Sequence, residues 1–314
     1  MTTKAQFPNE QTESGSFNRQ ADAFEAWVTA DGTSGFPAQA GRYHLYVSLA
    51  CPWAHRTIIM RRLKGLEKTI GMTVVDPVRD ERGWAFGQGD GLQPDPLNGF
   101  SFLREAYEKS APGYRGRVTV PVLWDSQNKT IVSNNDDHIL RMLETQFEEF
   151  ASNDTEYYPQ EHRKDIDALN DRIYETVNNG VYLAGFATRQ HAYERAARGL
   201  FAQLDALDER LCTRRYLFGS RPLETDWRLF VTLVRFDAVY YGHFKCNLRL
   251  IAQYPNLSGY LRDLYQIDGV SDTVNFDHIK RHYYFTHDDI NPTRIVPVGP
   301  VQNLGAPHGR EGLS

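Results

Sequence analysis

A cysteine followed by proline, Cys51-Pro52, most constrains this chain, because it stands between a strand-like run and a helix-like run. The strand is predicted over residues 43–48 and the helix over residues 52–65. Proline suits the first turn of a helix, where no N–H donor is needed. The first N–H groups of a helix and the positive end of its dipole favour a thiolate. The pattern therefore predicts a nucleophilic thiol at Cys51.

The motif carries a single thiol, because Ala54 stands where a CxxC oxidoreductase has its second cysteine. A single thiolate attacks sulfur and forms a mixed disulfide, which a second thiol from another molecule must then resolve. A buried structural role is the alternative for Cys51, but the setting between strand and helix favours the nucleophile. Cys212 and Cys246 stand in no such setting and are expected to be passive.

The first half of the chain has the element order of a thioredoxin-like domain. A second strand is predicted over residues 72–75, parallel to the first because a helix connects the two. Residues 76–116 are predicted to be irregular, and their glycine cluster at 87–91 matches no phosphate-binding motif. A β-hairpin over 118–133 and a helix over 138–150 complete the order.

Pro121 lies inside the first strand of this hairpin and leaves two interpretations open. Since proline cannot donate to a ladder, the strand is predicted to lie at an edge of the sheet or to be irregular. The alternative is a cis Val120-Pro121 bond at the start of the strand, which would expose the main chain of Val120 to a ligand.

The second half of the chain is helical to near residue 269, and residues 226–240 are apolar nearly all round, which predicts a central buried helix. We therefore predict an irregular N-terminal arm over 1–40 and an α/β thioredoxin-like domain over 41–150. An all-α domain with an irregular tail is predicted over 151–314.

Composition and charge exclude several classes of protein. A net charge of −5 and an isoelectric point near 6.1 argue against a nucleic-acid partner. The polar N-terminus resembles no signal peptide, and no run of about 18 apolar residues predicts a membrane span. Three cysteines form no paired framework, which favours a reducing, cytoplasmic compartment. The ten histidines show no metal-binding spacing, so no metal is expected.

Several stretches of the chain, in order from about residue 40 to 310, resemble the xi class of glutathione transferases, the glutathionyl-hydroquinone reductases. These stretches are CPWA (51–54), GRVTVPVLW (116–124), ETVNNGVY (175–182), LVRFD (233–237), HFKC (243–246), VNFDH (274–278) and NP (291–292). The resemblance implies a glutathione transferase fold, in which a thioredoxin-like domain precedes a helical one. It also implies a homodimer.

The implied reaction removes glutathione from a quinol conjugate through a mixed disulfide on Cys51, and a second glutathione regenerates the thiol. By resemblance, glutathione is the co-substrate and the residues that bind it are Trp84, Arg117 and Val118. Trp84 would stack over the peptide, Arg117 would bind a carboxylate, and the main chain of Val118 would pair with the cysteinyl part.

The resemblance places the aromatic part of the substrate on Tyr182, Tyr240 and Tyr283, whose hydroxyls would hold the quinol oxygens and stabilise a phenolate. The alternative function is a transferase that conjugates glutathione to electrophiles, although that chemistry is expected to use a serine or tyrosine hydroxyl. A protein of this fold that binds a partner without catalysis is disfavoured, because the thiol is present in its activating setting.

Two positions depart from the family pattern. Asn135-Asp136 stands where the family has Glu-Ser, which holds the γ-glutamyl group of glutathione. Asp136 offers a site for an ammonium but would repel a carboxylate, so another small thiol such as mycothiol is an alternative to glutathione. Leu223 replaces the usual Ser/Thr N-cap of the central helix, and Thr225 or Asp226 is expected to cap it one turn later.

Overall fold

The computed structural model describes residues 10–87 and 92–314. Its chain divides into two compact units. The thioredoxin-like unit contains residues 21–155 and 272–282, and the helical unit contains the residues up to Gln20 together with 156–271 and 283–314. The predicted arm is thus shared between the two units. The predicted glycine loop at 87–91 lies, apart from Gly87, outside the described residues.

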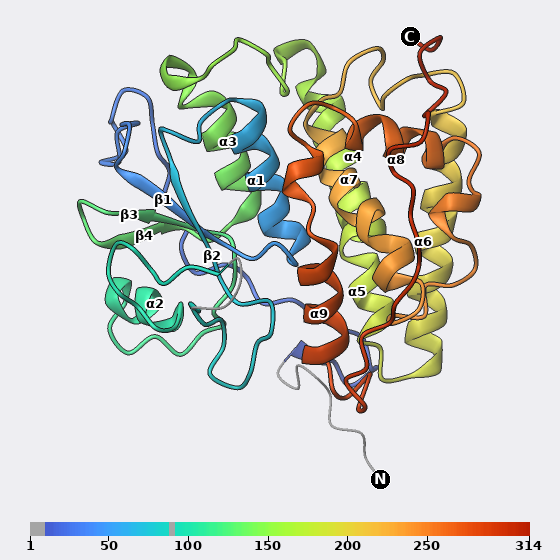
Figure 1. Cartoon of the computed structure of the whole chain (residues 1–314), viewed down its shortest axis with the longest axis horizontal. Helices are drawn as coiled ribbons and strands as arrows, with labels where there is room; N and C mark the ends of the chain where they lie inside the picture. Colours follow the sequence, from blue (N-terminus) through green and yellow to red (C-terminus); the bar gives the residue numbers. More distant parts are fainter. Residues whose placement is uncertain (1–9, 88–91) are drawn as a thin grey trace. The chain divides into compact units, whose positions relative to one another are not determined.

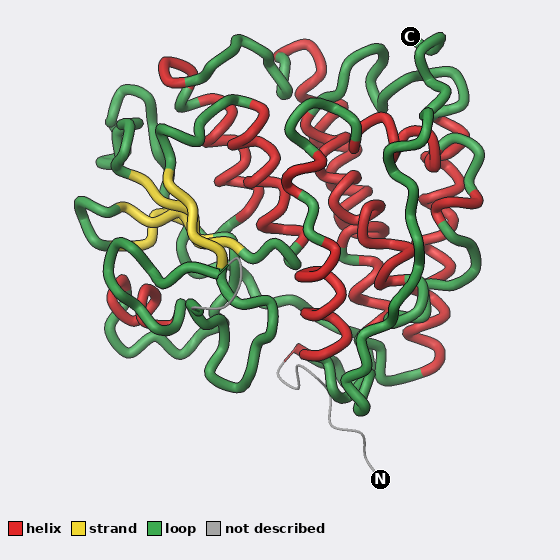
Figure 2. Tube along the Cα trace, viewed as in Figure 1, coloured by secondary structure: helices red, strands yellow, loops and turns green. Residues whose placement is uncertain are grey.

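The strands of the thioredoxin-like unit form one mixed sheet with the order β2-β1-β3-β4 (Figures 1 and 2). The first two strands are parallel, as predicted, and the other pairs are antiparallel. The strands are β1 (Tyr43–Val47), β2 (Gly71–Val74), β3 (Val122–Asp125) and β4 (Thr130–Ser133).

β3 lies inside this sheet, between β1 and β4, so an edge position is wrong, but the strand is irregular because its register with β4 shifts between Leu123 and Trp124. The alternative is confirmed, because the Val120-Pro121 peptide is cis and Pro121 immediately precedes the strand. Proline is tolerated there because β3 begins only at Val122, so the ladder does not need a proline N–H.

Three α-helices belong to the sheet region of this unit. Figure 1 shows α1 (Pro52–Leu63) and α3 (Asp136–Thr145) on one face of the sheet and α2 (Arg104–Ser110) on the other. A short 3-10 turn, η2 (Glu148–Phe150), follows α3. The helix α2 is a correction, because residues 76–116 were predicted to be irregular; its seven residues and its uncapped Leu103 start carry little periodic signal.

The arm residues 21–30 cover the outer side of β4. Ala26 N donates to Val132 O over 3.0 Å, and Asn134 N donates to Phe24 O over 3.0 Å. These bonds satisfy main-chain groups that an edge strand would otherwise expose, and they keep the sheet from pairing with another chain.

The helical unit is built around α7 (Glu224–Arg235), all of whose residues are buried, which confirms the predicted central helix. Five-residue π-helical turns, η4 and η5, follow α4 and α7 directly. The other elements of this unit are η3 (Gln160–His162), α4 (Arg163–Ile173), η4 (Tyr174–Asn178), α5 (Gly180–Gly185), α6 (Gln190–Arg210), η5 (Phe236–Tyr240), η6 (Ile251–Gln253) and α8 (Leu257–Tyr265). Two further elements, η7 (Ser271–Thr273) and α9 (Phe276–Thr286), are divided between the two units. The boundary between the two units falls within α9, after His282. Of the helices in the described ranges, none is both long and apolar enough to cross a membrane.

Asp226 caps α7, but from within its first turn. Its carboxylate accepts hydrogen bonds from Leu223 N (2.8 Å), Leu217 N (3.0 Å) and the Tyr260 hydroxyl (2.7 Å). The helix therefore starts at Glu224 and not one turn later as expected. Burial raises the pKa of Asp226 to about 6, although these donors oppose the shift.

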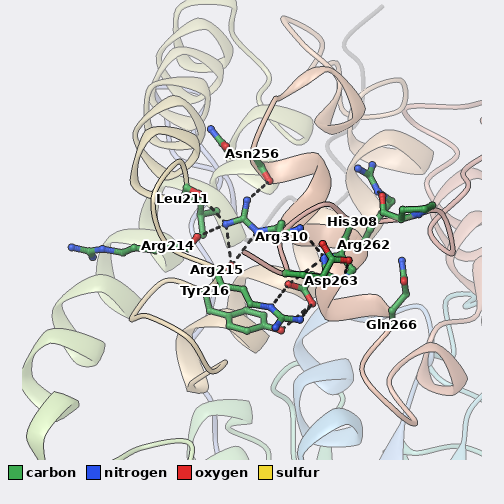
Figure 3. A network of polar contacts seen from close by, with 12 residues as sticks. Leu211, Arg214, Arg215, Tyr216, Asn256, Arg262, Asp263, Gln266, His308 and Arg310 are labelled. Carbon is green, nitrogen blue, oxygen red and sulfur yellow. Dashed lines mark hydrogen bonds and ion pairs between the residues drawn. The ribbon is translucent and has the colours of Figure 1, made fainter. Parts of the chain in front are cut away.

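The C-terminal tail is fixed to the helical unit by the buried guanidinium of Arg310 (Figure 3). It donates to main-chain oxygens that follow α6, at Leu211 (2.9 Å), Arg214 and Arg215 (3.0 Å). A cation at this end of a helix complements the helix dipole and the unsatisfied carbonyl groups.

Candidate active site

Cys51 is the N-cap of α1 and Pro52 is its first residue, as the sequence predicts. Cys51 has an extended conformation, with φ −76° and ψ 123°, and its carbonyl accepts the hydrogen bond from His55 N at 3.0 Å. The thiol is half-buried and donates to Val120 O over 3.6 Å, next to the cis peptide. The thiol therefore lies at the positive end of a helix, where a thiolate is favoured.

The residues that follow Cys51 anchor the start of this helix. The buried guanidinium of Arg56 donates to Asp136 (2.7 Å) and Asp137 (3.0 Å) in the first turn of α3, and it lies 4.8 Å from the ring of Trp53. His55 shares a hydrogen bond of 2.8 Å with Thr273. Arg56 thus ties the N-terminus of α1 to that of α3.

Asn135 and Asp136 are occupied by structural contacts at the same place. Asn135 is the N-cap of α3, and its side chain accepts from His138 N over 3.0 Å. The Asp136 carboxylate, 18% exposed, is paired with Arg56. Its charge is therefore countered by a cation, which weakens the repulsion that a ligand carboxylate would otherwise meet.

Trp84, Arg117 and Val118 all belong to the thioredoxin-like unit, but they differ in their surroundings. The Trp84 indole is buried, stacked on His282 with centroids 5.1 Å apart, and the Arg79 guanidinium lies 5.5 Å from its ring. Arg117 is half-buried. Within residues 10–87 and 92–314, no group hydrogen-bonds to the main chain of Val118. Val118 therefore leaves one N–H and one C=O available to a ligand.

The three predicted tyrosines meet at their hydroxyl groups in the helical unit. The Tyr283 oxygen lies 2.5 Å from that of Tyr182 and 3.0 Å from that of Tyr240. Burial raises the pKa values of Tyr240 and Tyr283 well above their usual range, so both hydroxyls stay protonated at neutral pH. The group is a ready source of hydrogen-bond donors.

The π-helical turns place two of these tyrosines. The turn η4 ends just before α5, which carries Tyr182, and Tyr240 is the last residue of η5. Asn178 of η4 donates to Arg228 O (2.9 Å) and Thr232 Oγ1 (2.7 Å) of α7, which holds η4 against the central helix. An inserted residue in a helix turns the following side chains to a new direction, a common device at functional sites.

Residues beside the tyrosines were not assigned a role from the sequence. His243 and His287 are buried and share a hydrogen bond of 3.1 Å, and burial lowers the pKa of His243 to about 4. Arg19, from the predicted arm, lies over the ring of Tyr182. The family stretch HFKC at 243–246 could have identified His243 as a site residue. The polar segment around Arg19 has no feature that could have identified Arg19.

In the described ranges, no three histidine, cysteine or carboxylate side chains gather closely enough to hold a metal ion. Cys212 and Cys246 are free thiols, and burial raises the pKa of Cys246 far above its usual range, in keeping with a passive role.

Comparisons with known proteins agree on one family. Residues 50–146 match the N-terminal domain model of glutathione S-transferases, and residues 190–263 match the C-terminal domain model. The glutathionyl-hydroquinone reductase YqjG of Escherichia coli is 52% identical, over 95% of this chain and 93% of its own. The glutathionyl-hydroquinone reductase PcpF of Sphingobium chlorophenolicum is 50% identical, over 92% of this chain and 91% of its own.

Solved structures give the same result. The glutathione-bound structure of YqjG from Escherichia coli K-12 has a TM-score of 0.90 and 52% identity, covering 92% of this chain and 96% of that one. A xi-class enzyme from Natrialba magadii has a TM-score of 0.92 and 50% identity, with coverages of 94% and 90%. The predicted fold, a thioredoxin-like domain followed by a helical one, is thereby confirmed. The chain belongs to the xi class of glutathione transferases, together with the glutathionyl-hydroquinone reductases that it matches.

Proposed function

We propose that this protein is a thiol-dependent reductase that removes glutathione from glutathionyl-hydroquinones through Cys51. The Cys51 thiolate attacks the sulfur of the conjugate, a Cys51–glutathione disulfide forms, and the bond from that sulfur to the ring carbon breaks. Before this bond breaks, a proton moves from a quinol hydroxyl to the ring carbon that bears the sulfur. The electron pair of the breaking bond then passes into the ring and onto that oxygen, the resulting phenolate takes up a proton, and hydroquinone leaves. A second glutathione gives up a proton and displaces Cys51 from the disulfide, which yields glutathione disulfide.

The observation that carries this proposal is the single thiol at the N-cap of α1, with Ala54 in place of a resolving cysteine. The helix end favours the nucleophilic thiolate, and the missing second cysteine requires an external thiol. The names of the relatives from Escherichia coli and Sphingobium chlorophenolicum agree with this chemistry.

We infer that the external thiol is glutathione, with mycothiol as the alternative that the experiment below also tests. The glutathione in the related YqjG structure supports glutathione. So do the available main chain of Val118 and the pairing of Asp136 with Arg56. Trp84, Arg117, Asn135 and Asp136 remain proposed contacts of this thiol.

We propose that Tyr182, Tyr240 and Tyr283 serve the quinol ring. Because burial keeps the protons on Tyr240 and Tyr283, their hydroxyls are able to donate to a quinol oxygen that gains negative charge as the ring carbon–sulfur bond breaks. We further propose a cytoplasmic homodimer, supported by the family and by the three free cysteines. Light scattering of the purified chain tests the dimer.

The test compares the wild type with Cys51→Ser, and with Cys212→Ser as the matched loss of an exposed thiol. Each is mixed with glutathionyl-hydroquinone, and free hydroquinone is measured with glutathione present, whereas the mass of the protein is measured after a single turnover without it. The wild type and Cys212→Ser are expected to release hydroquinone and to carry one glutathionyl group, and Cys51→Ser to do neither. If Cys51→Ser releases hydroquinone as fast as the wild type, the proposal is overturned. Faster turnover with mycothiol conjugates than with glutathione conjugates would identify mycothiol as the co-substrate. Conjugation of electrophiles by the wild type indicates the transferase alternative.

A further inference from the structure

The N-terminal segment 10–19 is fixed to the loop that follows α5. Gln11 Nε2 donates to Phe186 O over 3.1 Å, and Thr188 N donates to Gly15 O over 3.1 Å. The rings of Phe17 and Phe186 lie 5.3 Å apart. At Gly15, φ is +80° and an added Cβ would lie 2.3 Å from Arg189 Cγ, so only glycine fits this close approach. The segment is thus seated against the helical unit.

This segment places the charge of Arg19 over one of the tyrosines. The guanidinium carbon lies 5.2 Å from the ring centroid of Tyr182 and 5.7 Å from that of Phe17. A cation over an aromatic face is attracted by the electron density of the ring, and it withdraws electron density in return. The Tyr182 hydroxyl is therefore a stronger hydrogen-bond donor with Arg19 in place.

The hydroxyls of the three tyrosines are linked to one another, and a second arginine, Arg235, lies near two of them. Tyr182 is bonded to Tyr283, which is bonded to Tyr240, and burial keeps the protons on the last two. Arg235 of α7 is fully buried, and its charge lowers the pKa values of Tyr240 and Tyr283 against the effect of burial. Arg19 lies over the ring of Tyr182 itself.

We propose that Arg19 is a positioning residue of the reductase reaction, which acts through Tyr182 to stabilise the negative charge on the quinol oxygen. The inference rests on the proposed function, because it concerns the step in which the ring carbon–sulfur bond breaks. The N-terminal arm would thus contribute to the breakage of the ring carbon–sulfur bond. It would not contribute to the exchange of the Cys51–glutathione disulfide with a second glutathione. Arg19 is not itself required to touch the substrate.

The experiment uses two reactions of the full-length protein. In the first, hydroquinone release from glutathionyl-hydroquinone is measured, with kcat and KM separated. In the second, the reduced protein reacts with glutathione disulfide, which forms the same adduct on Cys51 but contains no ring. Arg19→Met is expected to lower kcat of the first reaction about tenfold and to leave the second unchanged. Arg19→Lys, which keeps the charge, is expected to restore most of kcat.

The control is Arg198→Met, which removes an exposed arginine from α6 and is expected to match the wild type in both reactions. Thermal unfolding of each variant is recorded, and if Arg19→Met fails to fold, Arg19→Gln replaces it. A wild-type kcat in a folded Arg19→Met or Arg19→Gln overturns the inference, and so does an equal loss in both reactions. If the wild type releases no hydroquinone at all, the proposed function fails instead.

Discussion

Position 136 has a carboxylate where the family resemblance implies serine. The contacts of this carboxylate in the structure alter how strongly it would repel a ligand. Taken from the sequence, Asp136 repels the γ-glutamyl carboxylate of glutathione. In the structure its charge is bound by Arg56, which also holds Asp137. What remains is the loss of a hydroxyl donor at 136 and of an acidic side chain at 135.

The double variant Asn135→Glu/Asp136→Ser restores the family pair and is expected to lower KM for glutathione about tenfold. The reason is that one hydrogen bond to a charged group contributes about 1.5 kcal/mol or more. Steady-state kinetics with varied glutathione measures the change. Asp137→Ser removes the other partner of Arg56 without adding a donor at 136, and KM should stay the same. A rise of KM in the double variant would show that Asp136 itself binds the ammonium of glutathione.

Local sequence is enough to predict some residues of the site and not others. Cys51 and Pro52 owe their roles to neighbours in the chain, a strand before and a helix after, and the structure has them as predicted. The stacking of Trp84 on His282, and the position of Arg19 over Tyr182, depend on contacts between distant segments. No spacing in the sequence reports such contacts.

Among the elements, α7 combines an almost completely buried helix with a buried acid at its start. Asp226 is held by three donors, and yet burial raises its pKa from 3.8 to about 6. Between these two values the folded state binds more protons than the unfolded state. Stability from this group is therefore full below about pH 4 and is lost as pH rises through 6.

Asp226→Asn is expected to remove this pH dependence. The free energy of unfolding of the wild type, relative to the variant, should fall by about 2 kcal/mol between pH 4 and pH 7, because each pKa unit corresponds to about 1.4 kcal/mol and the unfolded group is already more than half ionised at pH 4. Denaturant unfolding of both proteins across this range measures the difference. Asp154→Asn, at an exposed acid, serves as the control. A difference that is constant with pH would show that Asp226 has an ordinary pKa.

Helices and strands with a clear period were predicted from the sequence to within a few residues, whereas the π-helical turns were not. The turns η4 and η5 continue α4 and α7 with the same kinds of residue. What distinguishes them is a main-chain hydrogen bond to the fifth preceding residue in place of the fourth, from Asn179 N to Tyr174 O and from Tyr241 N to Phe236 O. This difference leaves the apolar pattern of the sequence unchanged. Periodicity therefore predicts that Tyr182 and Tyr240 lie on helices. It does not predict the directions in which their side chains point.

At the scale of the whole chain, the tail after α9 is attached mainly over residues 304–310, where Gln266 Nε2 donates to Leu304 O (2.9 Å) and Ala306 O (2.7 Å). Arg310 binds the end of α6 (Figure 3). The main-chain oxygen of His308 approaches α8 so closely that a Cβ on Gly259 would lie 2.6 Å from it. The exposed side chains of Val298 and Val301 contribute little to the attachment. The anchor is therefore concentrated near residue 310.

Arg310→Met is expected to lower the free energy of unfolding by about 2 kcal/mol or more, because buried carbonyl groups lose charge-assisted donors. Gly259→Ala should loosen the same tail through steric contact, and both variants should be cut in the tail by low concentrations of protease. Gly199→Ala, with open space around the added methyl group, is the control and should be neutral or slightly stabilising. Intact tails in both variants would place the anchor elsewhere.

The meeting of the tyrosine hydroxyls also bears on how the quinol preference of such an enzyme is altered. Tyr182, Tyr283 and Arg19 lie outside the two ranges that match the general transferase models, 50–146 and 190–263. Only Tyr240 lies inside them. The residues that we propose to act on the quinol therefore lie mostly outside the segments that the general transferase models describe. Exchanging the segments that carry these residues between relatives is the corresponding route to altered quinol preference.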